Sequence, residues 1–424
     1  MSSKILALYH YYRPDDVAGG RHITDYCEWL AQKGWLVEVW PSNRNCHNPQ
    51  IKYSTKTEVI NGVKVRRVWR PAWRQHSNLG RVLGAVWMMK FWFWRFLFSP
   101  GDRPDILVIG TDPIFCLGIA PFLKWIHPQM KVVHWCFDLY PEYAIANGMA
   151  KDTGAVVKLL RWFMGKGYDR CELVADIGPC MREKLGRYPA KARTTHTPWS
   201  FEEPSEPLPM DLAERRELFG ALPMGDTSTG SGISARPNQD TPLALLYSGN
   251  FGLPHEFYMT LKLARAAKED GLVLCYSVHG SRVGSLQKAV NPEDINVRFA
   301  PFAPAERLAA RLSCPDVHVV SLRSPWTGLL VPSKFFGALA VGRPVLFEGD
   351  ADSSIARWIG EYGVGWVLGH DNVEEVRTEL LRFSKDPKTK AGMFQRCFQT
   401  YQQHFSKKAV LDAWDRDLRA MFQA

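Results

Sequence analysis

A serine and a lysine stand at the start of a predicted helix whose other residues are almost all apolar. The stretch GLLVPSKFFGALAVGRPVLFEG covers residues 328–349, and Ser333 and Lys334 follow its proline. Gly342 ends the helix, and the apolar run 344–347 predicts a short buried strand. A cation in the first turn opposes the helix dipole, which favours anions at that end. An anionic ligand shared by the helix terminus and the ammonium would explain the lysine; a solvated lysine is the alternative.

Two further segments in the second half place small polar residues between a predicted strand and a helix. YSGNFGLPHEF contains Gly249 and Asn250, and EGDADSSIARW contains Ser353 in a helix-capping position. Together with Ser333 and Lys334, these segments bring three predicted helix N-termini to one end of the same sheet. That arrangement predicts a nucleotide-phosphate site there.

A glycine pair in RPDDVAGGRH stands at the entrance of the first predicted helix. Gly19 and Gly20 would let a diphosphate approach the backbone closely, while a tight turn without a ligand is the alternative. The pattern is not G-x-G-x-x-G, and the chain contains no G-x-S-x-G, H-E-x-x-H or G-x-x-x-x-G-K-[ST]. The sequence therefore gives little support to a hydrolase, a metalloprotease or a P-loop protein.

His134 and Asp138 lie in or just after a predicted strand, in VVHWCFDLYPE. Catalytic groups collect at the carboxyl ends of such strands, which makes both residues candidates. A structural histidine and a capping aspartate are the alternatives. The D-x-D strings at 350–352 and 415–417 are common by chance, so we expect no metal site and no cofactor.

The composition is that of an ordinary globular protein with anionic partners. The chain has 424 residues, 46% apolar and 23% charged, with a net charge of +10. Such a charge suits nucleotide phosphates, nucleic acid or an acidic lipid surface, but no basic run or recognisable module supports nucleic-acid binding. The nine cysteines form no C-x-x-C pair, which fits a reducing cytoplasm, and the N-terminus predicts a strand and no signal peptide.

Predicted strands alternate with helices along both halves of the chain, which indicates two parallel, doubly wound sheets. We expect an α/β protein with two Rossmann-like domains facing across a cleft, the first over residues 1–198 and the second over 242–405. Residues 199–241 are rich in Pro, Gly, Ser and Thr and predict a linker with a flexible loop. A last amphipathic helix falls within 406–424.

One stretch of the first domain, RVLGAVWMMKFWFWRFLF, is dense in Trp and Phe and has no acidic residue. Its cations and its place before a predicted strand argue against a membrane span. One interpretation is a helix that lies in an anionic membrane interface; the alternative is a helix buried on all sides. The residues assigned to membrane or acceptor contact are Trp87, Lys90, Trp92, Trp94 and Arg95.

In their order along the chain, these motifs resemble a family 4 retaining glycosyltransferase of the GT-B fold. The resemblance covers YYRPDDVAGGRHITDYCEWLAQKGWLVEV, PDILVIGTDP, HWCFDLYPEYAIANG, ELVADIGPCMREKL, LLYSGNFG, and VPSKFFGALAVGRPVLF with DSSIARWIGEYGVGWVL. It is closest to the branch that makes bacterial surface polysaccharides, in which D-L-Y-P-E and P-S-K recur.

The resemblance implies that the second domain binds a nucleotide sugar, with a UDP- or GDP-sugar as the first choice. It implies a lipid-linked or oligosaccharide acceptor on the first domain, a last helix that crosses back to that domain, and a peripheral location on the inner face of the plasma membrane. Transfer would retain the anomeric configuration without a metal. The implied catalytic residues are Asp138, Lys334 and His134, and the implied donor-binding residues are Gly19, Gly20, Gly249, Asn250, Arg282, Thr327, Ser333, Lys334 and Ser353.

Three positions depart from the pattern of the family. Its paired glutamates have no counterpart here, because no acidic residue occurs between Asp316 and Glu348. Phe137 stands where relatives often have a histidine, and Asn250 stands where many have an arginine. A catalytically inactive GT-B scaffold that binds a partner enzyme or a membrane is therefore the alternative function.

Overall fold

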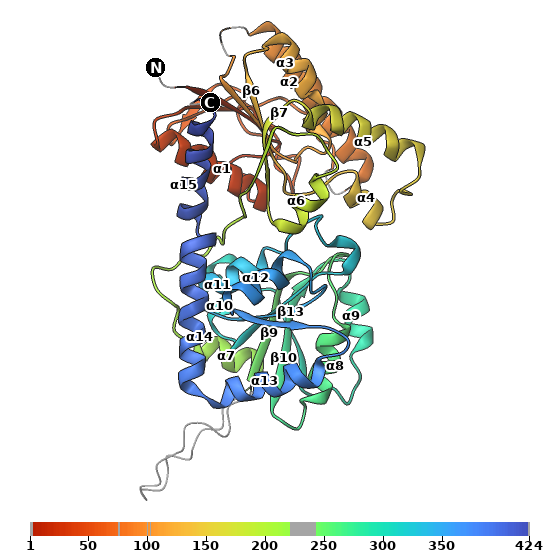
Figure 1. Ribbon diagram of the computed structural model, residues 1–424, viewed down its shortest axis with the longest axis vertical. Coiled ribbons are helices and arrows are strands. Elements are labelled where there is room, and N and C mark those ends of the chain that lie inside the picture. The colour runs from red at the N-terminus through yellow and green to blue at the C-terminus, as the bar shows by residue number, and fades with distance from the viewer. Residues whose placement is uncertain (1–2, 75–76, 100, 102, 221–242, 423–424) are drawn as a thin grey trace, which may run out of the picture. The chain divides into compact units, whose positions relative to one another are not determined.

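The chain forms two compact units in the computed structural model, which describes residues 3–74, 77–99, 101, 103–220 and 243–422. Unit 1 comprises Met1–Thr197, Gly328–Leu330 and Val410–Ala424, and unit 2 comprises Pro198–Thr327 and Val331–Ala409 (Figure 1). The loop that the sequence predicts to be flexible, at 221–241, lies outside the described residues.

Unit 1 is built on an eight-stranded sheet in the order β3-β4-β2-β1-β5-β6-β7-β8. The central strands pair in parallel, and only β3 and β4 are antiparallel within the described part of this sheet. The central strands read as continuous apolar runs because helices cover both faces of a parallel sheet. The strands are β1 (Lys4–Leu8), β2 (Leu36–Val39), β3 (Glu58–Ile60), β4 (Val63–Val65), β5 (Ile106–Ile109), β6 (Lys131–Trp135), β7 (Cys171–Asp176) and β8 (Ala192–Thr195).

The helices of unit 1 connect these strands. They are α1 (Ala18–Gln32), α2 (Asn78–Phe98), the 3-10 turn η2 (Cys116–Ile119), α3 (Ala120–Ile126), α4 (Glu142–Ala146), α5 (Ala155–Tyr168) and α6 (Pro179–Leu185). The last helix, α15 (Lys407–Ala420), lies beside α1 (Figure 1). Among the described helices, none combines the length and the apolar character that a membrane crossing needs.

Unit 2 is built on a six-stranded parallel sheet in the order β11-β10-β9-β12-β13-β14. The strands are β9 (Leu243–Asn250), β10 (Leu272–His279), β11 (Val297–Ala300), β12 (Val317–Ser321), β13 (Val345–Glu348) and β14 (Gly365–Leu368). The order in which strands are added to the sheet reverses between β9 and β12, so loops from both sides of this point meet at the carboxyl edge of the sheet, where ligands bind in such folds.

Helices of unit 2 surround this sheet. They are α7 (Leu212–Phe219), α8 (Tyr258–Ala266), α9 (Val283–Ala289), α10 (Leu308–Ser313), α11 (Lys334–Ala340), α12 (Ser354–Tyr362), α13 (Val373–Lys385) and α14 (Pro387–Thr400). Two 3-10 turns, η3 (Ala305–Arg307) and η4 (Ser324–Trp326), and the π-turn η5 (Tyr401–Phe405) complete the unit. The core forms where α8 and α13 pack on β9 and β10.

Candidate functional site

Lys334 is the first residue of α11, and its ammonium lies over the end of β9. Its Nζ donates a hydrogen bond to the Asn250 carbonyl at 2.9 Å and lies 5.4 Å from the centre of the Tyr247 ring. Partial burial lowers the pKa of Lys334 to about 8, because an ammonium loses hydration there. Within the described residues, no carboxylate forms an ion pair with it. The structure thus holds an uncompensated cation at the carboxyl edge of the sheet.

Gly249 leaves room for that lysine. It has a φ of +124°, and a Cβ atom at this position would lie 2.8 Å from Cε of Lys334. Any other residue would strain the backbone and displace the lysine side chain. The structure therefore brings together Gly249, Asn250 and Lys334, three of the residues that the sequence assigned to one site.

The helix N-termini at this edge differ from the expectation of three open anion sites. The carboxylate of Glu348, at the end of β13, accepts hydrogen bonds from the backbone amides of Met259 and Thr260 at 2.8 and 3.1 Å. An internal carboxylate thus already occupies the first turn of α8, where the helix dipole favours its ionised form. Ser353 is buried and caps α12 by accepting from the Ala356 amide at 3.3 Å. Ser333, before α11, is exposed and its side chain makes no capping bond.

Arg282 lies directly before α9 and contacts the loop that precedes α8. One of its Nη atoms donates to the His255 carbonyl, the other lies 3.8 Å from the Glu256 carboxylate, and the guanidinium lies 5.3 Å from the Phe257 ring. The positive charge of Arg282 is therefore partly balanced by Glu256 within unit 2. His255 donates to the Ser321 carbonyl at 3.0 Å, and burial, with Lys334 nearby, lowers its pKa to about 3. No sequence signal marks His255 as a neighbour of Lys334.

Thr327 is hydrogen-bonded to Asp350, which follows β13. Its hydroxyl donates to the Asp350 carboxylate at 2.8 Å, and Ser324 donates to the other oxygen of the same carboxylate. Asp350 is partly exposed, and it lies close in sequence to the segment in which the family has its paired glutamates. The described residues contain no cluster of three or more His, Cys, Asp or Glu side chains suited to a metal ion.

Asp138 lies at the carboxyl edge of the sheet in unit 1. It is partly exposed, and desolvation raises its pKa to about 6, while Arg81 acts to lower it and Asp112 to raise it. The Thr111 hydroxyl accepts from the Phe137 amide at 2.8 Å and donates to the Trp135 carbonyl at 3.3 Å, so it joins the ends of β5 and β6 just before Asp138. These bonds fix the strand ends from which Asp138 projects.

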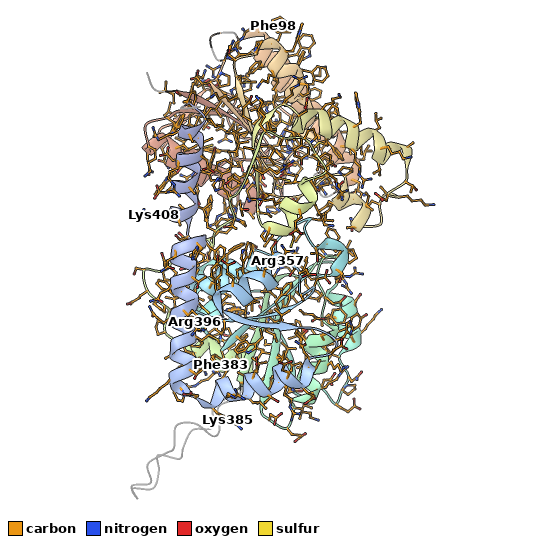
Figure 2. The ribbon with its side chains drawn as sticks, viewed as in Figure 1. Phe98, Arg357, Phe383, Lys385, Arg396 and Lys408 are labelled. Carbon is orange, nitrogen blue, oxygen red and sulfur yellow. The ribbon has the colours of Figure 1, made fainter. Side chains whose placement is uncertain are left out.

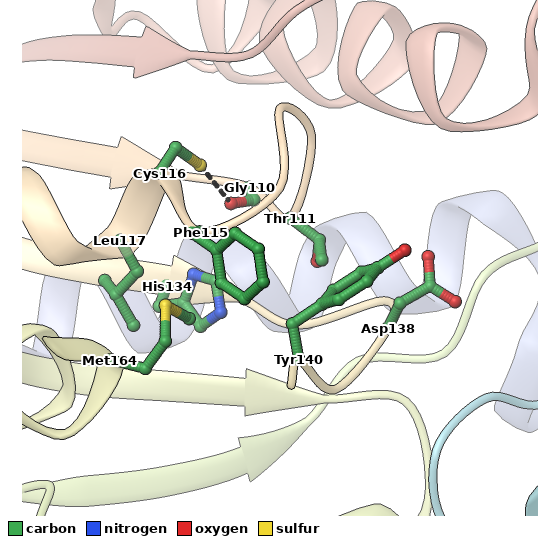
Figure 3. Close-up of a pocket in the computed structure, with 9 residues that line it drawn as sticks. All are labelled: Gly110, Thr111, Phe115, Cys116, Leu117, His134, Asp138, Tyr140 and Met164. Atoms are coloured by element: carbon green, nitrogen blue, oxygen red, sulfur yellow. Dashed lines mark hydrogen bonds between the residues drawn. The ribbon is translucent and has the colours of Figure 1, made fainter. Parts of the chain in front are cut away.

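His134 lines the same small cavity as Asp138 but from its opposite end (Figure 3). The cavity has a volume of about 10 Å³, which is space for a single water molecule. His134 is buried, its Nδ1 donates to the Ile109 carbonyl at 2.8 Å, and burial lowers its pKa to about 4. These features correct the expectation that its imidazole is free to contact a substrate.

Two charged groups near Asp138, Asp112 and Arg81, were not found from the sequence. His10, after β1, lies 3.3 Å from the Asp112 carboxylate, after β5. Arg81, on α2, donates to the Tyr140 hydroxyl at 3.1 Å. The position of Asp112 directly after a predicted strand was a usable signal, whereas Arg81 depends on where α2 packs.

Gly19 and Gly20 lie in the first turn of α1, and packing within unit 1 explains both glycines. A Cβ atom on Gly19 would lie 2.1 Å from the Tyr9 hydroxyl, and one on Gly20 would lie 3.2 Å from Cβ of Tyr11. The side chains that follow β1 therefore already occupy the space beside these glycines.

The aromatic stretch forms α2, and its assigned residues divide between two faces. Trp92 is fully buried and its Nε1 donates to the Trp40 carbonyl at 2.8 Å, which corrects its assignment to membrane contact. Arg95 is partly buried, donates to the Arg66 carbonyl and lies over the Trp40 ring. Lys90 and Trp94 are exposed, and Trp87 is partly exposed.

The opposite face of α2 is apolar and exposed. Its exposed apolar residues are Leu79, Val82, Leu83, Val86, Phe91, Trp94 and Phe98. Phe98 projects from the end of the helix (Figure 2).

Comparison with known proteins gives consistent matches over both halves of the chain. The model of the glycosyl transferase 4-like domain matches residues 18–198. The chain is 24% identical over 298 residues to the probable glycosyltransferase WbjE of Pseudomonas aeruginosa, covering 68% of this chain and 69% of that protein. It is 22% identical over 375 residues to the putative colanic acid biosynthesis glycosyl transferase WcaI of Escherichia coli K12, covering 84% of this chain and 85% of that protein.

A solved structure supports the fold over the full length. The catalytic domain of starch synthase IV from Arabidopsis thaliana, solved with ADP and acarbose, superimposes with a TM-score of 0.65, covers 98% of both chains and is 11% identical. The chain therefore carries a glycosyl transferase 4-like domain, has the GT-B fold, and is a glycosyltransferase similar to those of bacterial surface-polysaccharide biosynthesis.

Proposed function

We propose that this protein is a retaining, metal-independent glycosyltransferase that moves a sugar from a UDP- or GDP-sugar to a lipid-linked saccharide. The product would belong to a polysaccharide or glycolipid. The observation that carries the proposal is Lys334, a cation without a carboxylate partner among the described residues, held beside a glycine at the carboxyl edge of the unit 2 sheet. The name of WcaI and the ADP bound to starch synthase IV support the reaction class and the diphosphate.

In this proposal unit 2 binds the donor through its diphosphate. Lys334 contacts a phosphate oxygen, and Gly249 and Asn250 bring the backbone close to it. Ser333, whose hydroxyl makes no capping bond, donates to the same group, while Ser353, Thr327 and Arg282 hold the surrounding loops.

The sugar–diphosphate bond breaks as the acceptor oxygen bonds to the same carbon, from the face that the diphosphate leaves. The acceptor proton passes to the departing diphosphate. Negative charge grows on the diphosphate in the transition state, where the ammonium of Lys334 stabilises it.

Unit 1 binds the acceptor near Asp138. Its carboxylate is partly exposed and accepts no hydrogen bond from the described side chains, so it is available to an acceptor hydroxyl. His134 is a positioning residue in this scheme, since its hydrogen bond to the Ile109 carbonyl ties β6 to β5 below Asp138.

The exposed apolar face of α2 contacts the inner face of the plasma membrane. The helix carries no acidic residue, and Lys90 lies on the exposed face with Trp94 and Phe98. Aromatic residues with cations and no acid suit the headgroup region of an anionic membrane. The lipid-linked acceptor would then be delivered at the surface where unit 1 docks.

Thermal-shift binding of UDP, GDP, ADP and TDP tests the donor site. One of these diphosphates should raise the melting temperature of the wild type and leave Lys334→Ala unchanged. Lys385→Ala, an exposed lysine of unit 2 at the end of α13 (Figure 2), is the matched control and should respond as the wild type does. If all four diphosphates fail to stabilise the wild type, the donor site is wrong.

A catalytically inactive scaffold is the second candidate, and one observation favours it. The carboxylate of Glu348 is turned to the amides of α8, and no acid precedes it back to Asp316. A scaffold predicts that Lys334→Ala restores polysaccharide synthesis fully in a deletion strain, whereas the enzyme predicts near-complete loss.

A further inference from the structure

A buried carboxylate holds two arginines side by side on the surface of unit 1. Glu142, the first residue of α4, is 6% exposed. Its Oε1 accepts from Arg161 Nε, from Arg187 Nη1 and from the Tyr188 hydroxyl, each at 3.1 Å. Because one buried charge fixes both guanidiniums, their remaining N–H groups are oriented before any ligand arrives.

Positive charge exceeds the buried negative charge at this cluster. Arg161 also donates to Asp152 at 2.6 Å, but the Asp152 side chain is 66% exposed, so solvent weakens that pair. The Arg187 side chain is 45% exposed and contacts Glu142 through Nη1 alone. Lys158 and Lys166, on the same helix as Arg161, are exposed and pair with no acid among the described residues.

The two arginines border a shallow depression of about 640 Å³. It is lined by Arg161, Trp162, Gly165, Arg187, Tyr188 and Pro189. Gly165 leaves the floor open, because a Cβ atom there would meet only the Tyr188 ring, at 3.8 Å. A tetrahedral anion fits such a site, since its oxygens can accept from both guanidiniums.

An apolar stripe on α5 adjoins the depression. Val156, Leu159 and Trp162 follow at every third position and are 69%, 62% and 60% exposed. Lys158 and Lys166 flank the stripe. The helix between α2 and α5 in space, α3, contacts both of them, and its Phe122 and Trp125 are also exposed.

We propose that the Arg161–Arg187 depression binds the phosphate of an anionic phospholipid, with the α5 stripe inserted among the neighbouring headgroups. A free phosphate would need only the arginines, whereas the exposed Leu159 and Trp162 gain from burial in the acyl boundary. The inference rests on the membrane contact proposed above and adds a defined headgroup site to it.

Flotation with vesicles of phosphatidylcholine alone, and with added phosphatidylglycerol, tests the proposal on the full chain. The wild type should float only with phosphatidylglycerol. Arg187→Gln should weaken that binding about fivefold, as expected for one basic residue at an anionic surface. Arg377→Gln is the control, because Arg377 is likewise a partly exposed arginine paired with carboxylates, here Asp270 and Glu374, but lies in unit 2. It should float as the wild type does.

Loss of folding is separated from loss of binding by a second variant. Trp162→Ala leaves the Glu142 cluster intact. It should weaken flotation while its melting temperature remains equal to that of the wild type. Equal flotation of wild type, Arg187→Gln and Trp162→Ala would overturn the headgroup site. A melting-temperature rise with inorganic phosphate in the wild type and not in Arg187→Gln, together with equal flotation of the two proteins, would assign the depression to a free phosphate instead.

The test also separates this inference from the membrane contact of α2. If Val86→Ser with Trp94→Ser abolishes flotation while Arg187→Gln and Trp162→Ala float normally, only the headgroup site fails. If the wild type floats with neither vesicle, the proposed membrane contact fails as well.

Discussion

At the scale of single residues, Lys334 makes the donor site dependent on pH. Its pKa of about 8 means that the free protein loses the ammonium charge as the pH rises through 8. A bound diphosphate favours the charged form and raises this pKa. We therefore expect the affinity for the diphosphate to fall up to about tenfold per pH unit above pH 8, until the pKa of the bound state is reached.

Calorimetric titration of the diphosphate at pH 8.5 (about half a unit above that pKa) in two buffers of different ionisation enthalpy measures the linked proton. The wild type should take up a proton on binding, and Lys385→Ala should take up the same amount. Proton release, or an affinity that does not change between pH 7 and 9 (roughly one unit either side of the pKa), would remove Lys334 from the phosphate contact.

Gly249 permits a second residue-scale prediction. Gly249→Ala places a Cβ atom at a φ of +124° and 2.8 Å from Cε of Lys334. We expect a loss of about 1–3 kcal/mol in the free energy of unfolding, together with weaker diphosphate binding because the ammonium must move. Gly360→Ala, in α12, is the control, since a Cβ there meets nothing within 4 Å.

Denaturant titration and thermal shift with the diphosphate measure both effects. The Gly360 variant should be unchanged or slightly stabilised, as alanine is the better helix former. If Gly249→Ala keeps full affinity, the glycine serves the backbone alone and Lys334 is not held by it.

At the scale of elements, the sequence predicted local features well and long-range contacts poorly. The strand, loop and helix around Gly249 and the cap at Ser353 follow from spacing and capping residues within one short segment. The hydrogen bond from the Thr260 amide to the Glu348 carboxylate joins residues 88 positions apart, so no local pattern reveals it. On α2 both faces are apolar, so hydrophobicity could not tell that Trp92 is buried and Trp94 exposed.

The contact between β13 and α8 gives a pH-dependent prediction. Burial raises the pKa of Glu348 from 4.5 to about 7 although two amides act to lower it. The folded chain therefore holds this proton more tightly than the unfolded chain, and the free energy of unfolding falls as the pH rises from 4.5 to 7. Glu348→Gln removes this titration, so the wild type should lose about 3 kcal/mol relative to the variant over that range.

Urea unfolding of both proteins at pH 4.5, 6 and 7.5 (values chosen to bracket the roughly 1.36 kcal/mol per pKa unit of this linkage) measures the difference. Glu361→Gln, on the exposed side of α12, should track the wild type at every pH. If the difference in the free energy of unfolding between wild type and Glu348→Gln does not change with pH, Glu348 is ionised throughout and acts only as a fixed anion at the start of α8.

At the scale of the whole molecule, α15 completes unit 1 although it follows the last element of unit 2 in sequence. Trp414 is buried, with its ring 5.1 Å from Tyr26, 5.2 Å from Trp135 and 4.2 Å from His196. Asp415 accepts from the Trp35 indole at 2.7 Å. Asp417 lies 2.9 Å from Nε2 of His196. The core of unit 1 therefore depends on residues that follow unit 2 along the chain.

Trp414→Ala should destabilise unit 1 by about 3–5 kcal/mol, because it leaves a cavity between α1, β6 and α15. Hydrogen exchange followed by mass spectrometry can locate the loss, since amides of a cooperative unit lose protection together. We expect faster exchange in peptides from α1 and β6 and unchanged exchange in peptides from β9 and β10. Trp358→Ala removes the ring that packs against Phe335 and Phe405 in unit 2, and it should give the reverse pattern. Equal loss of protection in both units from either variant would mean that they unfold as one, and that the two substrate sites cannot be destabilised separately.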